Sequence, residues 1–223
     1  MSEFAPFTFA AIGVVRSPYK EKFGIPRQPR LALVEAELEL LEPYNDSDAI
    51  SGLDGFSHLW LTFVFHAVAE RGWKPLVRPP RLGGNAKVGV FASRSTHRPN
   101  PMGLSLVELV SVSVDNGVAL ELAGADLLDG TPVLDIKPYV PYADSIADAR
   151  AGFAQEAPAR LPVRWSITCD APRRELIEEV LAYDPRPAYQ DEPERIYGVH
   201  IGDSNVRFKI DANGVEIVAI QNI

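Results

Sequence analysis

Cysteine is almost absent from this chain, and so are long apolar runs. Of its 223 residues one is a cysteine, Cys169, which excludes a disulfide framework and a zinc site built from several cysteines. No apolar run approaches the roughly 20 residues that a membrane-spanning helix needs. The opening MSEFAPFTFAAIGVV has no basic segment before its apolar part, so a secretory signal is not expected. We therefore expect a cytoplasmic protein without a membrane partner.

Common catalytic signatures are missing as well. The chain has no G-x-S-x-G elbow, no phosphate-binding P-loop and no H-E-x-x-H zinc motif. Its four histidines are dispersed, and His58 and His66 would lie about 25 Å apart on an extended strand. They form no evident metal pair, so we expect no metal cofactor.

Positive charge is scarce overall but concentrated in two places. The chain has 22 Lys and Arg against 30 Asp and Glu, and its net charge of −8 alone argues against a nucleic-acid partner. However, the segment Arg16–Arg30 carries a local charge of +4, and Arg71–Arg98 carries +7 with no acidic residue. The rest of the chain then carries −19. Because phosphate binding depends on the local potential, RNA can still be accepted at one basic site.

The hydrophobic pattern is mostly that of β-strands. Leu31–Leu41 alternates apolar residues with glutamates, as in a half-buried strand. Leu59–Phe65 is apolar on both faces, which is typical of a central strand. A strand is also expected over Lys87–Ala92. Leu106–Val114 is followed at Asp115-Asn116-Gly117 by a hairpin signal. Many short strands without long helices between them predict a mainly β fold, a closed antiparallel barrel.

The composition changes after this region. Residues 141–163 are rich in Ala, Pro, Asp and Gly and are expected to form a partly ordered linker. Apolar residues at helical spacing then predict a helix over Pro172–Tyr183. Three short strands are expected after it, over Tyr197–Ile201, Val206–Ile210 and Val215–Ile220. We therefore predict a barrel domain over residues 1–150 and, over 165–223, a small domain of one helix and a three-stranded sheet.

Three segments carry residues suited to binding or catalysis. The first, Ser93–Ser105, follows a strand and is stiffened by two prolines; its polar side chains are Arg94, Ser95, Thr96, His97, Arg98 and Asn100. Loops of this kind at strand ends are where binding residues concentrate. The second, Tyr19–Arg30, combines Lys20 and Lys22 with aromatic residues and prolines, a mixture typical of contacts to RNA.

The third segment is Asp126–Tyr142, in which Asp129-Gly130 reads as a tight turn. Asp135 and Lys137 project from the same face of an extended stretch, because residues i and i+2 share a face. They form either an exposed ion pair on a barrel rim, worth under about 1 kcal/mol, or a carboxylate and an ammonium group aimed into one cleft.

Several stretches carry a resemblance to a known family: IGVVRSPYKEKFGIPRQP, FSHLWLTFVFH, PPRLGGNAKVGVFASRSTHRPNPMGLSLVEL and DLLDGTPVLDIKPYVPYADS. Together they resemble the TsaA-like β-barrel methyltransferases, and within them the bacterial tRNA methyltransferases that act on N6 of threonylcarbamoyl-adenosine at position 37, beside the anticodon. The match spans residues 9–148, and DPRPAYQ with YGVHIGDSNVRFKI resembles the C-terminal extension of those enzymes.

The resemblance implies a six- or seven-stranded barrel that binds S-adenosylmethionine, with tRNA as its partner. It also implies a homodimer with the cofactor near the subunit interface. The cofactor contacts it implies are Pro26, Arg27, Gln28, His66, Ala67, Arg94, Leu104, Asp129, Gly130, Thr131 and Pro132.

The chemistry of such a reaction assigns further residues. The methyl donor is a strong electrophile, so the protein mainly supplies positioning. The acceptor amine must lose a proton, and Asp135 or Asn100 could receive it. Lys137 and Arg98 could bind a carboxylate or a phosphate. Tyr139 or Tyr142 could stack on the base, and Lys20 and Lys22 could contact the tRNA.

Two alternatives remain open. One is a non-catalytic barrel that binds tRNA or a nucleotide. The other is a hydrolase that uses His66, His97 and Asp135 around a metal ion.

Overall fold

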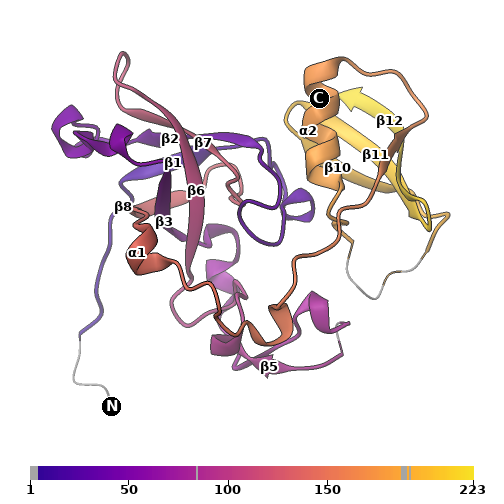
Figure 1. Ribbon diagram of the computed structural model, residues 1–223, viewed down its shortest axis with the longest axis horizontal. Helices are drawn as coiled ribbons and strands as arrows, with labels where there is room; N and C mark the ends of the chain where they lie inside the picture. Colours follow the sequence, from indigo (N-terminus) through magenta and orange to yellow (C-terminus); the bar gives the residue numbers. More distant parts are fainter. Residues whose placement is uncertain (1–4, 84, 187–189, 191) are drawn as a thin grey trace.

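The chain folds into a barrel and a C-terminal unit that is built on a second sheet (Figure 1). The structure is a computed structural model that describes residues 5–83, 85–186, 190 and 192–223. Residues 84 and 187–189 belong to stretches that carry the family resemblance, and they lie outside the described part. Within that part, no helix combines the length and the apolar character needed to cross a membrane.

Six antiparallel strands close into the barrel in the order β1-β2-β7-β6-β3-β8. Their bounds are Gly13–Arg16 for β1, Glu35–Leu40 for β2, His58–Val64 for β3, Met102–Ser113 for β6, Ala119–Ala123 for β7 and Pro132–Pro138 for β8. The predicted closed antiparallel barrel is confirmed, with six strands. Closure pairs each strand on both sides, which removes the free edges of an open sheet.

The barrel core comes from alternate residues of the strands. In β3, Leu59 and Leu61 are fully buried and Phe63 is 4% exposed. Trp60 and Thr62 are only half-buried, because alternate side chains of a strand point to opposite faces. The outer face of β3 is therefore available to line a site.

The stretch Leu31–Leu41, predicted as one strand, contributes side chains to two hydrophobic cores. Its strand β2 begins only at Glu35, and Leu38 lies buried inside the barrel. Ala32 and Val34, which are also buried, pack instead with residues of the C-terminal unit. Periodicity correctly marked these side chains as buried, but it could not say against which element.

The connection from β3 to β6 contains short elements only: η4 (His66–Arg71), β4 (Leu76–Val77), η5 (Pro80–Leu82), β5 (Val88–Gly89) and η6 (Val90–Ala92). The strand predicted over Lys87–Ala92 is wrong in extent, because only two residues pair with β4 and the chain then turns into a 3-10 helix. The other short elements are η1 (Lys22–Gly24), η2 (Ser47–Ile50), η3 (Leu53–Gly55), α1 (Pro141–Asp144) and η7 (Gly152–Ala154).

The C-terminal unit has a four-stranded sheet in the order β10-β11-β12-β9, with helix α2 packed on it. The elements are β9 (Val163–Trp165), α2 (Ala171–Leu181), β10 (Tyr197–Ile201), β11 (Ser204–Asp211) and β12 (Gly214–Asn222). The predicted helix and three strands are present, but the predicted strand number is wrong. Strand β9 is a fourth strand, which pairs in parallel with β12. It is only three residues long and its partner lies far away in the sequence, so no local pattern predicted it.

The connection between β1 and β2 links the two units, and we call residues 17–34 the bridging segment. Its Tyr19, only 1% exposed, forms a β-bridge with Ile201 of β10. Phe23 and Ile25 pack against the core of the C-terminal unit. That core therefore includes residues from the predicted barrel domain, and the division at residues 150 and 165 stays a prediction.

Candidate functional site

A cavity of about 690 Å³ lies where the barrel meets the bridging segment. Its lining comes from four parts of the chain, namely residues 22–29, 60–68, 93–105 and 126–131. The volume falls in the range of about 300–1,000 Å³ that small-molecule sites occupy.

Ten of the residues expected at the site line this cavity. From the expected cofactor contacts they are Pro26, Arg27, Gln28, His66, Ala67, Arg94, Leu104 and Thr131, and from the expected substrate contacts they are Lys22 and Arg98. The other expected residues, which are not part of the lining, are Asp129, Gly130, Pro132, Asn100, Asp135, Lys137, Tyr139 and Lys20. The roles of all these residues stay predictions.

Arg94 and Gln28 connect two walls of the cavity. The guanidinium of Arg94 donates a hydrogen bond from Nη1 to Oε1 of Gln28 in the bridging segment. Nearby, Lys22 Nζ donates to the carbonyl of Ala67 at 3.4 Å. Partial burial, together with the like charge of Arg71, lowers the pKa of Lys22 below its ordinary value. The cavity thus has a basic rim that suits an anionic group of a ligand.

Arg98 supports its own loop. Its Nη1 donates to the carbonyls of Ser93 at 2.9 Å and Val90 at 3.3 Å, and its guanidinium lies 5.8 Å from the ring centroid of Phe91. These contacts hold the loop in shape and occupy part of the side chain predicted to bind substrate.

The turn at residues 129–132 also has structural partners. Asp129 pairs with Lys20 at 2.9 Å and accepts a hydrogen bond from the backbone N–H of Ser17 at 3.0 Å. Burial opposes ionisation of Asp129, but these bonds outweigh it and hold its pKa below the ordinary value. Gly130 has a φ of +76°, which confirms the tight turn, and Pro132 stands opposite Val14 of β1. These contacts fix the turn, of which Thr131 lines the cavity.

Asp135 and Lys137 lie on the outer face of β8 as an exposed ion pair with each other. Asp135 stands opposite Thr62 of β3, and Lys137 opposite Trp60. Thr62 and Trp60 both line the cavity, so the ion pair lies one strand away from it. The barrel-rim alternative therefore describes the pair in this structure.

An aromatic cluster continues this outer face. The ring centroid of Tyr139 lies 6.1 Å from that of Trp60 and 6.3 Å from that of His58. Asn100 is exposed on its loop, and its carbonyl accepts a hydrogen bond from the N–H of Met102 at 2.7 Å.

Asp126 is a candidate that sequence reasoning missed. It lines the cavity, and its Oδ1 accepts a hydrogen bond of 2.5 Å from Oγ of the buried Ser105. Burial raises the pKa of Asp126, although the bond from Ser105 and the charge of Arg94 oppose that rise. The available signal was a carboxylate set between the apolar residues Ala125 and Leu127. It gives the cavity an acidic group near its basic rim.

The histidines do not gather into a site. In the part of the chain that the structure describes, no three His, Cys, Asp or Glu side chains lie close enough together to hold a metal ion. His66 lines the cavity, whereas His97 does not, and Nδ1 of His97 is buried with no hydrogen-bond partner among the described residues. The geometry thus gives the hydrolase alternative no support.

Comparison with known proteins gives consistent matches over both units. The family model of the tRNA-methyltransferase O N-terminal domain matches residues 14–145, and that of the TrmO C-terminal domain matches residues 152–223. The tRNA (adenine(37)-N6)-methyltransferase of Escherichia coli is 52% identical, with 96% of this chain and 98% of that protein covered.

Pseudomonas aeruginosa supplies two further relatives. A protein named as a putative S-adenosylmethionine-dependent methyltransferase, RcsF, is 51% identical over 88% of this chain and 90% of that protein. A crystal structure of TrmO from the same species superposes with a TM-score of 0.81 at 40% identity and covers 98% of this chain and 99% of that one.

Proposed function

This chain belongs to the tRNA-methyltransferase O family, and from that premise we propose that it transfers the methyl group of S-adenosylmethionine to N6 of adenosine 37 in tRNA. We further propose that the acceptor carries the threonylcarbamoyl group. The observation that supports the proposal best is the cavity, in which eight residues expected to contact the cofactor come together with the partly buried carboxylate of Asp126.

The residues of the cavity fit S-adenosylmethionine. The cofactor combines a carboxylate, an ammonium group, a sulfonium cation, ribose hydroxyls and an adenine ring. The guanidinium of Arg94 suits the carboxylate, and the carboxylate of Asp126 suits the ammonium group or the hydroxyls. Phe63, Leu104 and Leu128 provide apolar surface for the remaining atoms. When bound, the cofactor supplies an electrophilic methyl group.

The outer face of β3 and β8 suits the acceptor base. Trp60 contributes to the cavity wall and also contacts Tyr139, so a base stacked on this aromatic cluster would lie beside a cofactor in the cavity. Asp135 would accept the proton that N6 loses as the new bond to carbon forms. Lys137, which is paired with Asp135, would bind the threonyl carboxylate of the substrate.

The remainder of the tRNA would lie along the connection between β3 and β6. Besides Arg94, which lines the cavity, five exposed basic residues occupy this connection, namely Arg71, Lys74, Arg78, Arg81 and Lys87. Lysine and arginine side chains bind the phosphate backbone without reading sequence. The anticodon loop would then present its base at the aromatic cluster.

We also propose that the enzyme acts as a homodimer in the cytoplasm. Large apolar side chains near the cavity support an interface there, because Trp73, Leu76, Phe91 and Leu104 are all more than half exposed. Light scattering on the purified protein tests this part, and a monomeric mass at micromolar concentration would contradict it.

The test of the function is methyl transfer to defined tRNA. We expect radiolabel from S-adenosylmethionine to enter tRNA that bears threonylcarbamoyl-adenosine, and not tRNA without that group. Replacing Arg94 by alanine should lower kcat/KM for the cofactor by about 10- to 100-fold, the effect of losing a hydrogen bond to a charged group. A protein that binds the modified tRNA equally well with and without S-adenosylmethionine, and transfers no methyl group, would instead be a non-catalytic binding barrel.

A further inference from the structure

The bridging segment is fastened to the C-terminal unit by its backbone. Tyr19 forms a β-bridge with Ile201, and the N–H of Gly202 donates to the carbonyl of Pro18 at 2.8 Å. A side chain adds a third bond, since the carboxylate of Glu21 accepts from the N–H of His200 at 3.0 Å. The first part of the segment therefore follows the edge strand β10.

Apolar contacts continue this attachment toward the cavity. The ring centroid of Phe23 lies 6.3 Å from those of both Tyr197 and Phe208 in the C-terminal sheet. Gly24 is packed so closely that a Cβ atom at its position would lie 2.8 Å from Cγ2 of Val199. The bridging segment is thus held against the C-terminal sheet as far as Gly24.

Polar contacts hold the next residues. Nη2 of Arg27 donates to the carbonyl of Arg186 at 2.5 Å and lies 3.5 Å from the carbonyl of Asp184. These carbonyls belong to a turn in which Asp184 has a φ of +43°, a conformation uncommon for a residue other than glycine. A side chain must therefore stabilise the turn.

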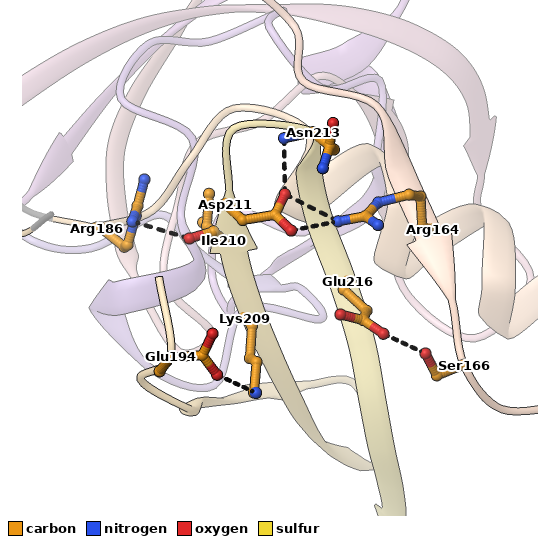
Figure 2. A network of polar contacts seen from close by, with 9 residues as sticks. All are labelled: Arg164, Ser166, Arg186, Glu194, Lys209, Ile210, Asp211, Asn213 and Glu216. Carbon is orange, nitrogen blue, oxygen red and sulfur yellow. Dashed lines mark hydrogen bonds and ion pairs between the residues drawn. The ribbon is translucent and has the colours of Figure 1, made fainter. Parts of the chain in front are cut away.

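Arg186 provides that stabilisation. Its Nε and Nη2 bind the two carboxylate oxygens of Asp184 at 3.0 and 2.9 Å, and its side chain is only 12% exposed. Its Nη1 also lies 3.5 Å from the carbonyl of Ile210 at the end of β11, as Figure 2 shows. The turn that receives Arg27 is thus itself tied to the C-terminal sheet.

These contacts lead directly to the cavity. Pro26, Arg27 and Gln28 line it, and Gln28 accepts the hydrogen bond from Arg94. We propose that Asp184 and Arg186 are positioning residues for the cofactor site, through which the C-terminal unit holds residues 26–28 and, by way of Gln28, the guanidinium of Arg94. This proposal rests on the proposed function, because it takes the cavity as the site of S-adenosylmethionine.

The expected consequence is a change in affinity. A loop that is already ordered before binding loses less conformational entropy when the ligand arrives. Without the side chain of Arg186, the turn that receives Arg27 would be less ordered, and the cofactor itself would have to order residues 26–28. We expect the Kd for S-adenosylmethionine to rise about five- to tenfold, within the range that such ordering costs.

The same unit offers a matched control. Arg164 binds both carboxylate oxygens of Asp211 at 2.9 Å, so it makes a similar arginine–aspartate pair, and Figure 2 shows both arginines. Among the described residues, the hydrogen bonds and the ion pair of the Arg164 side chain go to Asp211 and not to the bridging segment. Arg186→Gln and Arg164→Gln therefore each remove an arginine–aspartate pair of the same unit, although the side chain of Arg164 is more exposed, at 43% against 12%. Only the first pair supports the cavity.

The test combines two measurements on these full-length variants. Hydrogen exchange in the absence of cofactor should speed up in residues 22–28 for Arg186→Gln and stay unchanged for Arg164→Gln. Calorimetric titration with S-adenosylmethionine should show weaker binding only for Arg186→Gln, with KM for the cofactor raised and kcat retained. Unchanged exchange in Arg186→Gln overturns the proposal, as does faster exchange with unchanged affinity. If the wild-type protein binds no S-adenosylmethionine, the proposed function fails, while the exchange data still decide whether Asp184 and Arg186 hold residues 26–28 in place.

A second pair of variants covers the case in which Arg186→Gln does not fold. Gly24→Ala places a methyl group against Val199 and should push the segment away, which would weaken cofactor binding. Combining it with Val199→Ala restores the space, so affinity should recover in the double variant. An affinity that is unaffected by Gly24→Ala, or that stays low in a folded double variant, contradicts the proposal.

Discussion

Asp126 and Asp135 are two carboxylates with different surroundings. Asp126 lies in the cavity beside the buried Ser105, and burial raises its pKa. Asp135 lies on an outer strand face and is paired with Lys137. A partly buried carboxylate inside a cavity suits the binding of a cationic or hydroxyl-bearing ligand, whereas an exposed one beside an aromatic cluster suits contact with an arriving base.

The partly buried carboxylate of Asp126 should lower the free energy of unfolding when it is ionised. Because the folded state raises the pKa of Asp126, its contribution is most favourable below the pKa of the unfolded chain and is lost as pH rises through the folded value. Asp126→Asn removes the ionisable group and therefore the loss of stability that accompanies its ionisation. We expect its Tm to exceed that of the wild type by roughly 2–4 °C at pH 8, about 1 kcal/mol for a chain of this size, and the difference to shrink toward pH 4.

The same variant should bind S-adenosylmethionine at least about tenfold more weakly, since a charge-assisted hydrogen bond is lost. Scanning calorimetry over the pH range and isothermal titration measure the two effects. A variant that is less stable than the wild type at pH 8 would show that the carboxylate stabilises the fold.

Strand pairing explains how one wall can serve two ligands. Thr62 of β3 stands between Leu104 of β6 and Asp135 of β8, so these three residues form a row across the outer face. Partners in antiparallel strands have Cα atoms about 4.5–5.5 Å apart, which sets the spacing of the row. Leu104 and Thr62 line the cavity, and Asp135 lies beyond it.

This arrangement predicts the effect of Asp135→Asn. If the proton of N6 passes to Asp135, kcat should fall by about 100-fold or more, the contribution of a positioned general base. The Kd for S-adenosylmethionine should not change, because Asp135 is not part of the cavity lining. Single-turnover methylation measures the rate. The control is Glu39→Gln, which removes an exposed carboxylate paired with Arg16 on another barrel strand, and full turnover in Asp135→Asn would exclude the role.

At the scale of the molecule, the local charge of one segment is opposite in sign to the net charge of the chain. The chain carries −8 overall, yet the connection between β3 and β6, both ends of which line the cavity, carries several exposed basic residues. Such a surface would repel RNA over most of its area and attract it at one place. The net charge therefore favours a defined orientation of tRNA.

Salt should weaken tRNA binding accordingly. If Arg71, Lys74, Arg78, Arg81 and Lys87 contact phosphates, the logarithm of the binding constant should fall with the logarithm of salt concentration with a slope of about −3 to −5. Arg78→Ala should reduce the magnitude of that slope by about 1. Filter binding between low and moderate salt measures it, with Arg164→Gln as a variant that should keep the wild-type slope. A wild-type slope near zero would contradict the proposed surface.

The sequence by itself determined the elements whose signals are local. Alternation predicted which face of β2 is buried, whereas β3, predicted to be apolar on both faces, fully buries only alternate residues. Asn-Gly and Asp-Gly dipeptides predicted turns, because only glycine readily adopts their positive φ angles. Long motifs carried the family resemblance, and ten of the residues named from them or from the charge pattern line the cavity.

Only the tertiary structure decided how distant segments meet. Strand β9 joins the second sheet, and Ala32 and Val34 pack in a different core from Leu38. Asp135 lies outside the cavity that contains Asp126. The tertiary structure also joins Arg27 to the carbonyl of Arg186 across 159 positions. The physical reason is that periodicity records whether a side chain is buried, whereas its partner is chosen by packing between elements that no local pattern encodes.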